Sequence, residues 1–357
     1  MPLTINITDT LRKSVEAASG GRNTVLYTAK GQPCYMAVIP KFTLESIDAS
    51  LGTGTHPAFI VGGVEKNQLF IGQHIGVSRN GEMLSLPGVD PINTITHDAA
   101  INLVRANGAG WHLMSNVEWA ALSHWCWKNG FQPRGNSQYG RSSDLTTELG
   151  VRSDGLAVTG ANQGSQSRTL TGSGPTSWRH DNTPFGIADL NGNVWEWAPG
   201  MRINAGEIQI MADNNAALST ADFSAASVDW KAVDGATGAL VAPGTAGTVK
   251  YASANSGAAD FTLYRASGTS FEGMANSTGA NPVSAAALQL LKRHGLFPIA
   301  SSGLGGDGFY LNVADERVPI RGGLWDFAAI AGVFALSLIY PRSFAYVIIG
   351  ARPAFAS

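Results

Sequence analysis

The C-terminal segment, residues 321–357, constrains the fold more than any other part of this sequence. It reads RGGLWDFAAIAGVFALSLIYPRSFAYVIIGARPAFAS and contains no Lys, Glu, Gln, Asn, Met or Cys. Large apolar residues alternate in it with framework-like residues, which are Arg321, Gly322, Gly323, Trp325, Gly332, Pro341, Arg342, Gly350, Arg352 and Pro353. Such a segment forms either a second buried core or an exposed apolar surface, and this choice decides the function.

Composition favours a β- and loop-rich chain with a substantial core. Apolar residues make up 44% of the 357 residues, whereas charged residues make up 14%, well below the usual quarter. The 43 glycines point away from a helical protein. A net charge of −2 gives no electrostatic basis for binding nucleic acid or an anionic membrane.

Local signals predict a few helices with defined ends. Apolar spacing over 11–18 predicts a leading helix that stops at Gly20-Gly21. A second helix is predicted over 97–107 with Asp98 as its cap. The strongest helix begins with the capping box Ser115-Asn-Val-Glu118 and ends at 129–130. A short fourth helix is predicted over 285–294.

Strand signals are concentrated in the first third of the chain. Residues 33–45 predict a strand, and the runs 57–64 and 68–77 predict a hairpin joined by Glu65-Lys66-Asn67. Residues 134–180 read as long loops, and 200–285 as a low-complexity insert. We therefore expect a polar N-terminal segment over 1–32, suited to attachment or oligomerisation, and a ligand-binding domain over 33–357.

The usual catalytic and targeting signatures do not stand out. Cys34 and Cys126 are either two buried thiols or one bridge, and no metal-ligand spacing occurs. The histidines are scattered singly, and no nucleophile, phosphate-loop or dinucleotide fingerprint is present. Arg179-His180-Asp181 is a weak polar cluster in a loop. The start MPLTINITDT lacks a signal peptide, and the apolar run 327–340 is too short to span a bilayer.

Two aromatic motifs predict a rigid core. In Gly110–Trp119 (GWHLMSNVEW), His112 lies between Trp111 and Leu113, so a buried, hydrogen-bonded imidazole is expected. In NGNVWEW, a tight Asn-Gly turn precedes Trp195 and Trp197, with Glu196 between them. We expect Glu196 to accept hydrogen bonds from the backbone or an arginine. The alternative is a calcium site at Asn193 and Glu196.

Three segments follow one another along the chain. They are GWHLMSNVEWAALSHWCWKNGF, then FGIADLNGNVWEW, and then the frame formed by RGG-W, GVFAL, PRS and IG-RP. In this combination the sequence resembles the variable proteins of diversity-generating retroelements, especially those of phages and prophages. The resemblance covers about residues 33–357 apart from the stretch near 200–285. It implies an α+β, C-type-lectin-like fold of the formylglycine-generating-enzyme type, with long loops and inserts.

In that family, mutagenesis at adenines of AAC codons yields many residue types but never Trp, Met, Lys, Glu or Gln. The candidate variable, ligand-binding positions all carry reachable types; they are Leu324, Asp326, Phe327, Ile330, Ser337, Ile339, Tyr340, Phe344, Tyr346, Val347 and Ile348. We expect most of these to be exposed on a scaffold that includes Trp195 and Trp197, with Leu324 and Ile348 undecided. The GVFAL residues Val333, Phe334, Leu336 and Leu338 are expected in the core.

The resemblance implies a phage or prophage adhesin that binds a host-surface or partner ligand, with protein favoured over sugar. It implies no catalysis and no cofactor, calcium remaining an option, and a place on the virion tail or the cell surface. The rivals are an enzyme of the formylglycine-generating type and a structural virion protein. The enzyme would need a pair of C-terminal cysteines, and Cys126 is the last cysteine in the chain.

Overall fold

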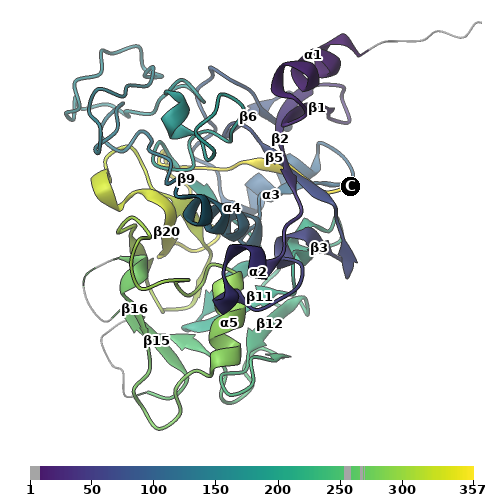
Figure 1. The fold of residues 1–357 in the computed structure, drawn as a ribbon, viewed down its shortest axis with the longest axis vertical. Helices are drawn as coiled ribbons and strands as arrows, with labels where there is room; N and C mark the ends of the chain where they lie inside the picture. Colours follow the sequence, from purple (N-terminus) through teal and green to yellow (C-terminus); the bar gives the residue numbers. More distant parts are fainter. Residues whose placement is uncertain (1–8, 253–258, 266–267, 269) are drawn as a thin grey trace, which may run out of the picture.

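The computed structural model describes residues 9–252, 259–265, 268 and 270–357, and it shows a mixed α+β, sheet-rich protein (Figure 1). Its helices are α1 (Thr10–Ser19), α2 (Leu44–Ile47), α3 (His97–Arg105), α4 (Asn116–Asn129) and α5 (Ala285–Arg293). Single 3-10 turns are η1 (Ala49–Leu51), η2 (Pro57–Phe59), η3 (Thr176–Trp178), η4 (Asn215–Ala217), η5 (Phe271–Gly273) and η6 (Ala328–Ile330). Among the described residues, no helix is long and apolar enough to cross a bilayer.

One sheet joins the two ends of the chain. Its order is β1 (Asn23–Tyr27), β2 (Pro33–Pro40), β5 (Gln68–Gly72), β22 (Pro353–Phe355) and β8 (Trp111–Leu113). The C-terminal strand β22 is antiparallel to both β5 and β8. Two short hairpins flank β5 in the sequence. Strand β3 (Ile60–Val61) pairs with β4 (Val64–Glu65) before it, and β6 (Gly76–Arg79) pairs with β7 (Glu82–Ser85) after it.

The second sheet carries the C-terminal segment. Its order is β17 (Phe309–Leu311), β20 (Gly332–Leu338), β19 (Ile320–Gly322), β9 (Trp195–Trp197) and β21 (Ile349–Gly350). Every residue of β20 is buried, since the strand has a neighbour on each edge and its residues pack in both apolar clusters of the core. The prediction that Val333, Phe334, Leu336 and Leu338 belong to the core is confirmed.

A third, larger sheet occupies the stretch expected to be a low-complexity insert, and that expectation is wrong. It contains β13 (Leu240–Val241), β12 (Trp230–Val233), β11 (Glu207–Met211), β14 (Lys250–Tyr251), β15 (Thr262–Arg265) and β16 (Met274–Asn276), with β10 (Met201–Asn204) and β18 (Glu316–Arg317) alongside. Its buried residues Ile203, Ile210 and Tyr251 share one apolar cluster with Phe309 and Leu336. The stretch is therefore part of the fold and not a loop excursion.

Helix α4 connects these sheets. Its predicted capping box is present, since Ser115 and Glu118 each accept the other's backbone N–H, and Gly130 ends it with φ 69°. The indole N–H of Trp119 donates to the backbone oxygen of Val333 on β20 at 2.7 Å. The predicted α1 is likewise confirmed, with Gly20 at φ 63° as its end.

Two local predictions are wrong. The cap of α3 is Thr96, whose hydroxyl accepts the N–H of Ala99 at 3.2 Å, because the helix starts one residue before Asp98. The runs 57–64 and 68–77 do not pair with each other. Two glycines at positive φ, Gly62 and Gly63, make an earlier turn that folds the first run on itself.

The N-terminal segment is not separate from the main domain in the described residues. Strand β1 pairs along its whole length with β2, from Asn23 opposite Ala37 to Tyr27 opposite Pro33. The expected boundary at residue 32 therefore falls inside a hairpin.

Candidate functional site

Two buried arginines hold the frame of the C-terminal segment. Arg352 is fully buried and donates to both carboxylate oxygens of Glu196, at 2.9 and 2.6 Å. It also donates to the backbone oxygens of Gly72 and Ala188. A guanidinium suits this place because its planar set of donors matches a carboxylate and further carbonyls together. The prediction that Glu196 accepts from an arginine is confirmed.

Arg321 also holds the frame through several hydrogen bonds. It donates twice to Oδ1 of Asn116, at 3.0 and 2.7 Å, and once to the backbone oxygen of Gly295 at 2.8 Å. Burial lowers the pKa of Arg321 to about 9. Arg321 therefore ties β19 to the start of α4 and to Gly295, two residues after the end of α5.

The two glycines after Arg321 redirect the chain. The β19–β20 register shifts between Arg321 and Gly322, and φ is 95° at Gly322 and 88° at Gly323. A Cβ on Gly323 would lie 2.6 Å from the Cβ of Ala331. Residues with a side chain are strained in this conformation and would also clash here. The bend turns the chain into the 324–331 loop that begins the candidate surface.

Most of the candidate variable side chains reach the surface. Asp326 and Tyr346 are exposed, with Tyr346 at 53%, and the half-buried set is Phe327, Ile330, Ile339, Tyr340, Phe344, Val347 and Ile348. The framework residues between them are buried, apart from the half-buried Pro341 and Arg342. We call the exposed and half-buried set the variable face.

Two expected members of this face are buried. Leu324 is 4% exposed and packs with Trp325 in the cluster around Trp195. Ser337 is 2% exposed because it lies in the interior strand β20, between Ile320 and Tyr310 of the neighbouring strands. Both fit the codon rule by residue type, but residue type does not determine which side of a strand or bend faces solvent.

Stacked aromatic rings form the centre of the variable face. The rings of Tyr340 and Phe344 are 4.0 Å apart and nearly parallel, at 5°, and Tyr346 follows at 6.2 Å from Phe344. A second group forms where Phe327 meets Trp195 edge-on at 5.4 Å. Such contacts fix the direction of the rings and lower the entropy that they lose on binding.

Tyr310 belongs to this surface and was missed from the sequence. Its ring lies 5.7 Å from that of Phe327 and 6.4 Å from that of Trp195, and the residue is half-buried. Tyr310 comes from β17, which pairs in parallel with β20. The strand-like run 309–311 was the available signal, but nothing local indicates which distant strand it joins.

The 341–346 turn is anchored by charged groups at its edge. Arg342 donates to both oxygens of Glu316, at 2.6 and 2.7 Å, and to Asp98 at 3.2 Å. The hydrogen bonds to Glu316 raise the pKa of Arg342. The backbone oxygen of Arg342 also accepts the N–H of His97. The turn that carries Phe344 and Tyr346 is therefore held in place at its base.

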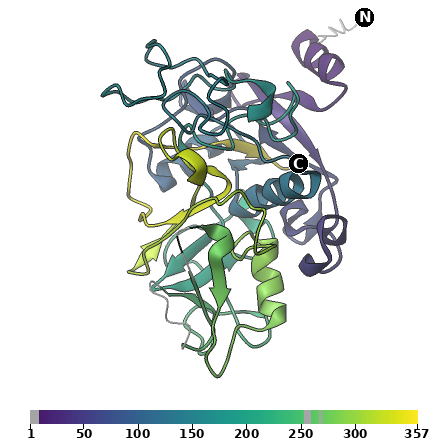
Figure 2. The same ribbon diagram turned by 60° about the vertical axis from the view of Figure 1, so that its left-hand side comes forward.

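Loop 134–180 borders the other end of the variable face. In both views the C-terminal segment, drawn in yellow, runs beside these teal loops (Figures 1 and 2). The N–H of Ala328 donates to Ser137 at 2.9 Å, and the N–H of Tyr139 donates to Trp325 at 2.6 Å. Through these backbone hydrogen bonds, loop 134–180 holds the 326–330 loop of the C-terminal segment in place.

The side chains considered for calcium have other bonds. Asn193 accepts the N–H of Thr169 through Oδ1 at 2.9 Å, and the carboxylate of Glu196 is neutralised by Arg352. Among residues 9–252, 259–265, 268 and 270–357, no group of three His, Cys, Asp or Glu side chains could hold a metal ion. His112, expected to be buried and bonded, lies 2.8 Å from Glu118.

The thiols are unsuited to nucleophilic chemistry. Cys34 and Cys126 are free and buried, as the two-thiol alternative expected. Burial raises the pKa of Cys34 to about 12 and also raises that of Cys126. A reactive cysteine needs an accessible thiolate, so neither side chain has the character of a catalytic thiol.

Comparison with known proteins gives a likeness in structure but none in sequence. No family model and no curated protein matches the sequence. Among solved structures, the chain is similar to Treponema denticola variable protein 1, at 12% identity and a TM-score of 0.35. The alignment covers 94% of this chain and 99% of that one.

Proposed function

We propose that this chain is a ligand-binding protein whose variable face is diversified by a retroelement, on a C-type-lectin-like scaffold of the formylglycine-generating-enzyme type. One observation carries the proposal. Within residues 321–357, framework residues are mostly buried, whereas nine of the eleven candidate variable positions are exposed or half-buried. A segment that separates in this way can change its surface residues without changing its fold.

The proposed ligand is a protein. The variable face presents Tyr340, Phe344, Tyr346 and Phe327, and aromatic residues dominate the energetically important positions of protein interfaces. Leaving such rings in water costs about 25 cal/mol per Å² of apolar area, which binding recovers. Asp326 is the single acidic residue of this segment, so a sugar-binding calcium site is less suited to it.

We place the protein on a virion tail or on a cell surface, as a phage or prophage adhesin that recognises a host-surface or partner protein. The buried thiols favour binding over thiol chemistry of the formylglycine-generating type. A purely structural virion protein would have no need of a half-exposed aromatic stack on a rigid frame.

Two displayed libraries test the proposal. The first varies Phe327, Tyr340, Phe344, Tyr346 and Val347 over NNC codons. The second, a matched control, varies five buried framework positions over the same codons: Arg321, Gly323, Trp325, Gly332 and Arg352. Protease resistance on the display particle is measured for both.

We expect most members of the first library to resist proteolysis and most members of the second to be cleaved, because the second removes buried bonds and turn geometry. Selection of the first library against an immobilised protein panel should yield binders. Equal losses of resistance in both libraries would contradict the proposal, since the variable face would then be part of the structural core.

A further inference from the structure

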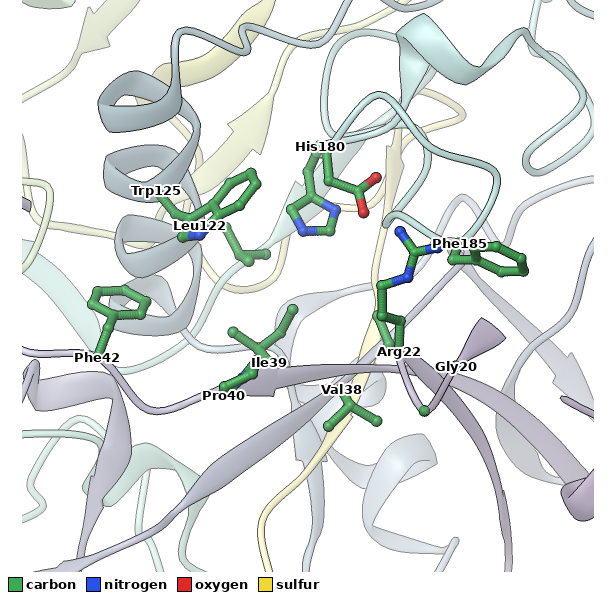
Figure 3. A pocket seen from close by; sticks show the side chains of 13 residues that line it. Gly20, Arg22, Val38, Ile39, Pro40, Phe42, Leu122, Trp125, His180 and Phe185 are labelled. Carbon is green, nitrogen blue, oxygen red and sulfur yellow. The ribbon is translucent and has the colours of Figure 1, made fainter. Parts of the chain in front are cut away.

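A cavity of about 430 Å³ lies away from the variable face, between the β1–β2 hairpin, α4 and the 180–185 loop (Figure 3). One end of it is apolar and is formed by Ile39, Phe42, Leu122 and Trp125. A volume of this size is in the range of sites that hold small molecules.

His180 gives the other end of the cavity a donor without a partner. The residue is 7% exposed and lines the cavity. Its Nδ1 accepts the N–H of Ile187 at 2.8 Å, so the ring proton is on Nε2. Burial lowers the pKa of His180 to about 4, which keeps the ring neutral at pH 7. No hydrogen bond joins Nε2 to another described residue, so this N–H is free to donate to a group in the cavity that the ring lines.

Two opposite charges lie next to this donor. Asp181 and Arg22 both line the cavity, and Thr183 connects them. Its hydroxyl oxygen lies 3.3 Å from Nη1 of Arg22 and 2.9 Å from Oδ1 of Asp181. Arg22 also stacks over the ring of Phe185, 4.6 Å from its centroid, which fixes the guanidinium at this end of the cavity.

We propose that this cavity binds a free α-amino acid with a large apolar side chain. The ammonium group pairs with Asp181, and the carboxylate accepts from the Nε2–H of His180 and from Arg22. The side chain fills the space between Leu122 and Trp125. A simple anion would leave Asp181 facing it without a cation, and a simple cation would leave the donors of His180 and Arg22 unused. This site is independent of the function proposed for the variable face.

Calorimetry with matched probes tests the chemistry of the site. L-Phenylalanine and L-leucine carry both charges, 3-phenylpropanoate lacks the ammonium group, and 2-phenylethylamine lacks the carboxylate. We expect an amino acid to bind the full chain at least about tenfold more tightly than either single-charge analogue. The Nε2–H resonance of His180 should shift when the amino acid binds.

Two variants test whether the amino acid binds in this cavity. Asp181→Asn is nearly isosteric, and Arg22→Gln changes an exposed side chain. Asp181→Asn should weaken amino-acid binding about tenfold or more while leaving 3-phenylpropanoate binding unchanged or stronger. Arg22→Gln should weaken the binding of both carboxylate probes. Tyr346→Ser, on the variable face, is the matched control and should change neither. Absence of amino-acid binding at millimolar concentration, equal binding of the three charge types, or binding unaffected by Asp181→Asn would each overturn the proposal.

Discussion

At the scale of single residues, burial and bonding separate framework positions from surface positions along one short segment. Arg352 has no exposed side chain and neutralises an equally buried Glu196. Tyr346, six positions earlier, is more than half exposed and touches another aromatic ring. Substitutions at the two kinds of position should therefore have very different costs.

Arg352→Met should destabilise the fold strongly, by about 3–5 kcal/mol, because it leaves the buried Glu196 carboxylate without its partner. The measurement is the free energy of unfolding in urea. Lys41→Met is the control, since Lys41 pairs with Glu65 at the surface and should lose at most about 1 kcal/mol. Equal effects of the two substitutions would show that the buried pair does not hold the frame.

Phe334→Ala should cost about 3–5 kcal/mol, because the 3%-exposed ring fills the core between the sheets. Tyr346→Ala should stay within about 0.5 kcal/mol of the parent, as surface substitutions generally do. Thermal unfolding of both variants is the measurement. A large loss of stability in Tyr346→Ala would place its ring in the core and remove it from the variable face.

At the scale of elements, short-range signals predicted the four longer helices, but they missed the short α2 and most of the sheet pairing. The limits of α4 were predictable because the Ser115–Glu118 box and Gly130 act within a single turn. Strands of two to five residues in the 200–285 stretch are too short to give a clear alternating pattern, even where neighbours such as β10 and β11 form a local hairpin. Other pairings, such as that of β10 with β18, join segments far apart in sequence and have no local signal, so this sheet was read as a low-complexity insert.

The candidate site shows the same limit. The codon rule and the frame motifs predicted correctly that Phe327, Tyr340 and Tyr346 reach the surface at least in part. They could not predict that Ser337 faces the interior, since this depends on the neighbours of β20 on both sides. Tyr310 was missed because β17 precedes the 321–357 segment in the sequence, and its pairing with β20 has no local signal.

The third sheet should prove essential to the fold. Tyr251 is 3% exposed, its ring lies 5.3 Å from that of Phe309, and its hydroxyl donates to the backbone of Leu296. Tyr251→Ala should cost about 3–5 kcal/mol, comparable to other large-to-small changes in a core. Val228→Ala, at an 82%-exposed position of the same stretch, should be nearly neutral. The measurement is the free energy of unfolding in urea. If Tyr251→Ala is as stable as Val228→Ala, the stretch is a dispensable insert and the prediction is wrong.

At the scale of the whole molecule, stability should depend on neutral buried histidines. Burial lowers the pKa of His124 to about 3 and that of His180 and His294 to about 4. An unfolded histidine has a pKa of about 6.5, so the unfolded chain binds more protons below that pH. Stability should therefore fall as the pH drops from about 6.5 toward 4. Asp307 acts in the opposite direction, because burial raises its pKa.

The free energy of unfolding in urea, at constant ionic strength, should be at least about 2 kcal/mol lower at pH 4.5 than at pH 7. The contribution of the histidines should exceed that of the carboxyls, because burial lowers the pKa of six imidazoles (His56, His74, His97, His124, His180 and His294), whereas the buried carboxyls with a raised pKa are Asp189, Glu196 and Asp307. An unchanged or higher stability at pH 4.5 would mean that the histidines are hydrated or charged in the folded protein.

The central claim is that residues 321–357 combine a fixed frame with a diversified surface, and population sequencing of this gene tests it most directly. Many copies from one population are compared codon by codon. We predict substitutions concentrated at 326, 327, 330, 339, 340, 344 and 346–348, with Trp325, Gly332, Pro341 and Arg352 constant. The buried positions 324 and 337 should vary less than their surface neighbours. A tail no more variable than residues 110–131 would contradict the account, and the aromatic rings of the variable face would then have a structural role.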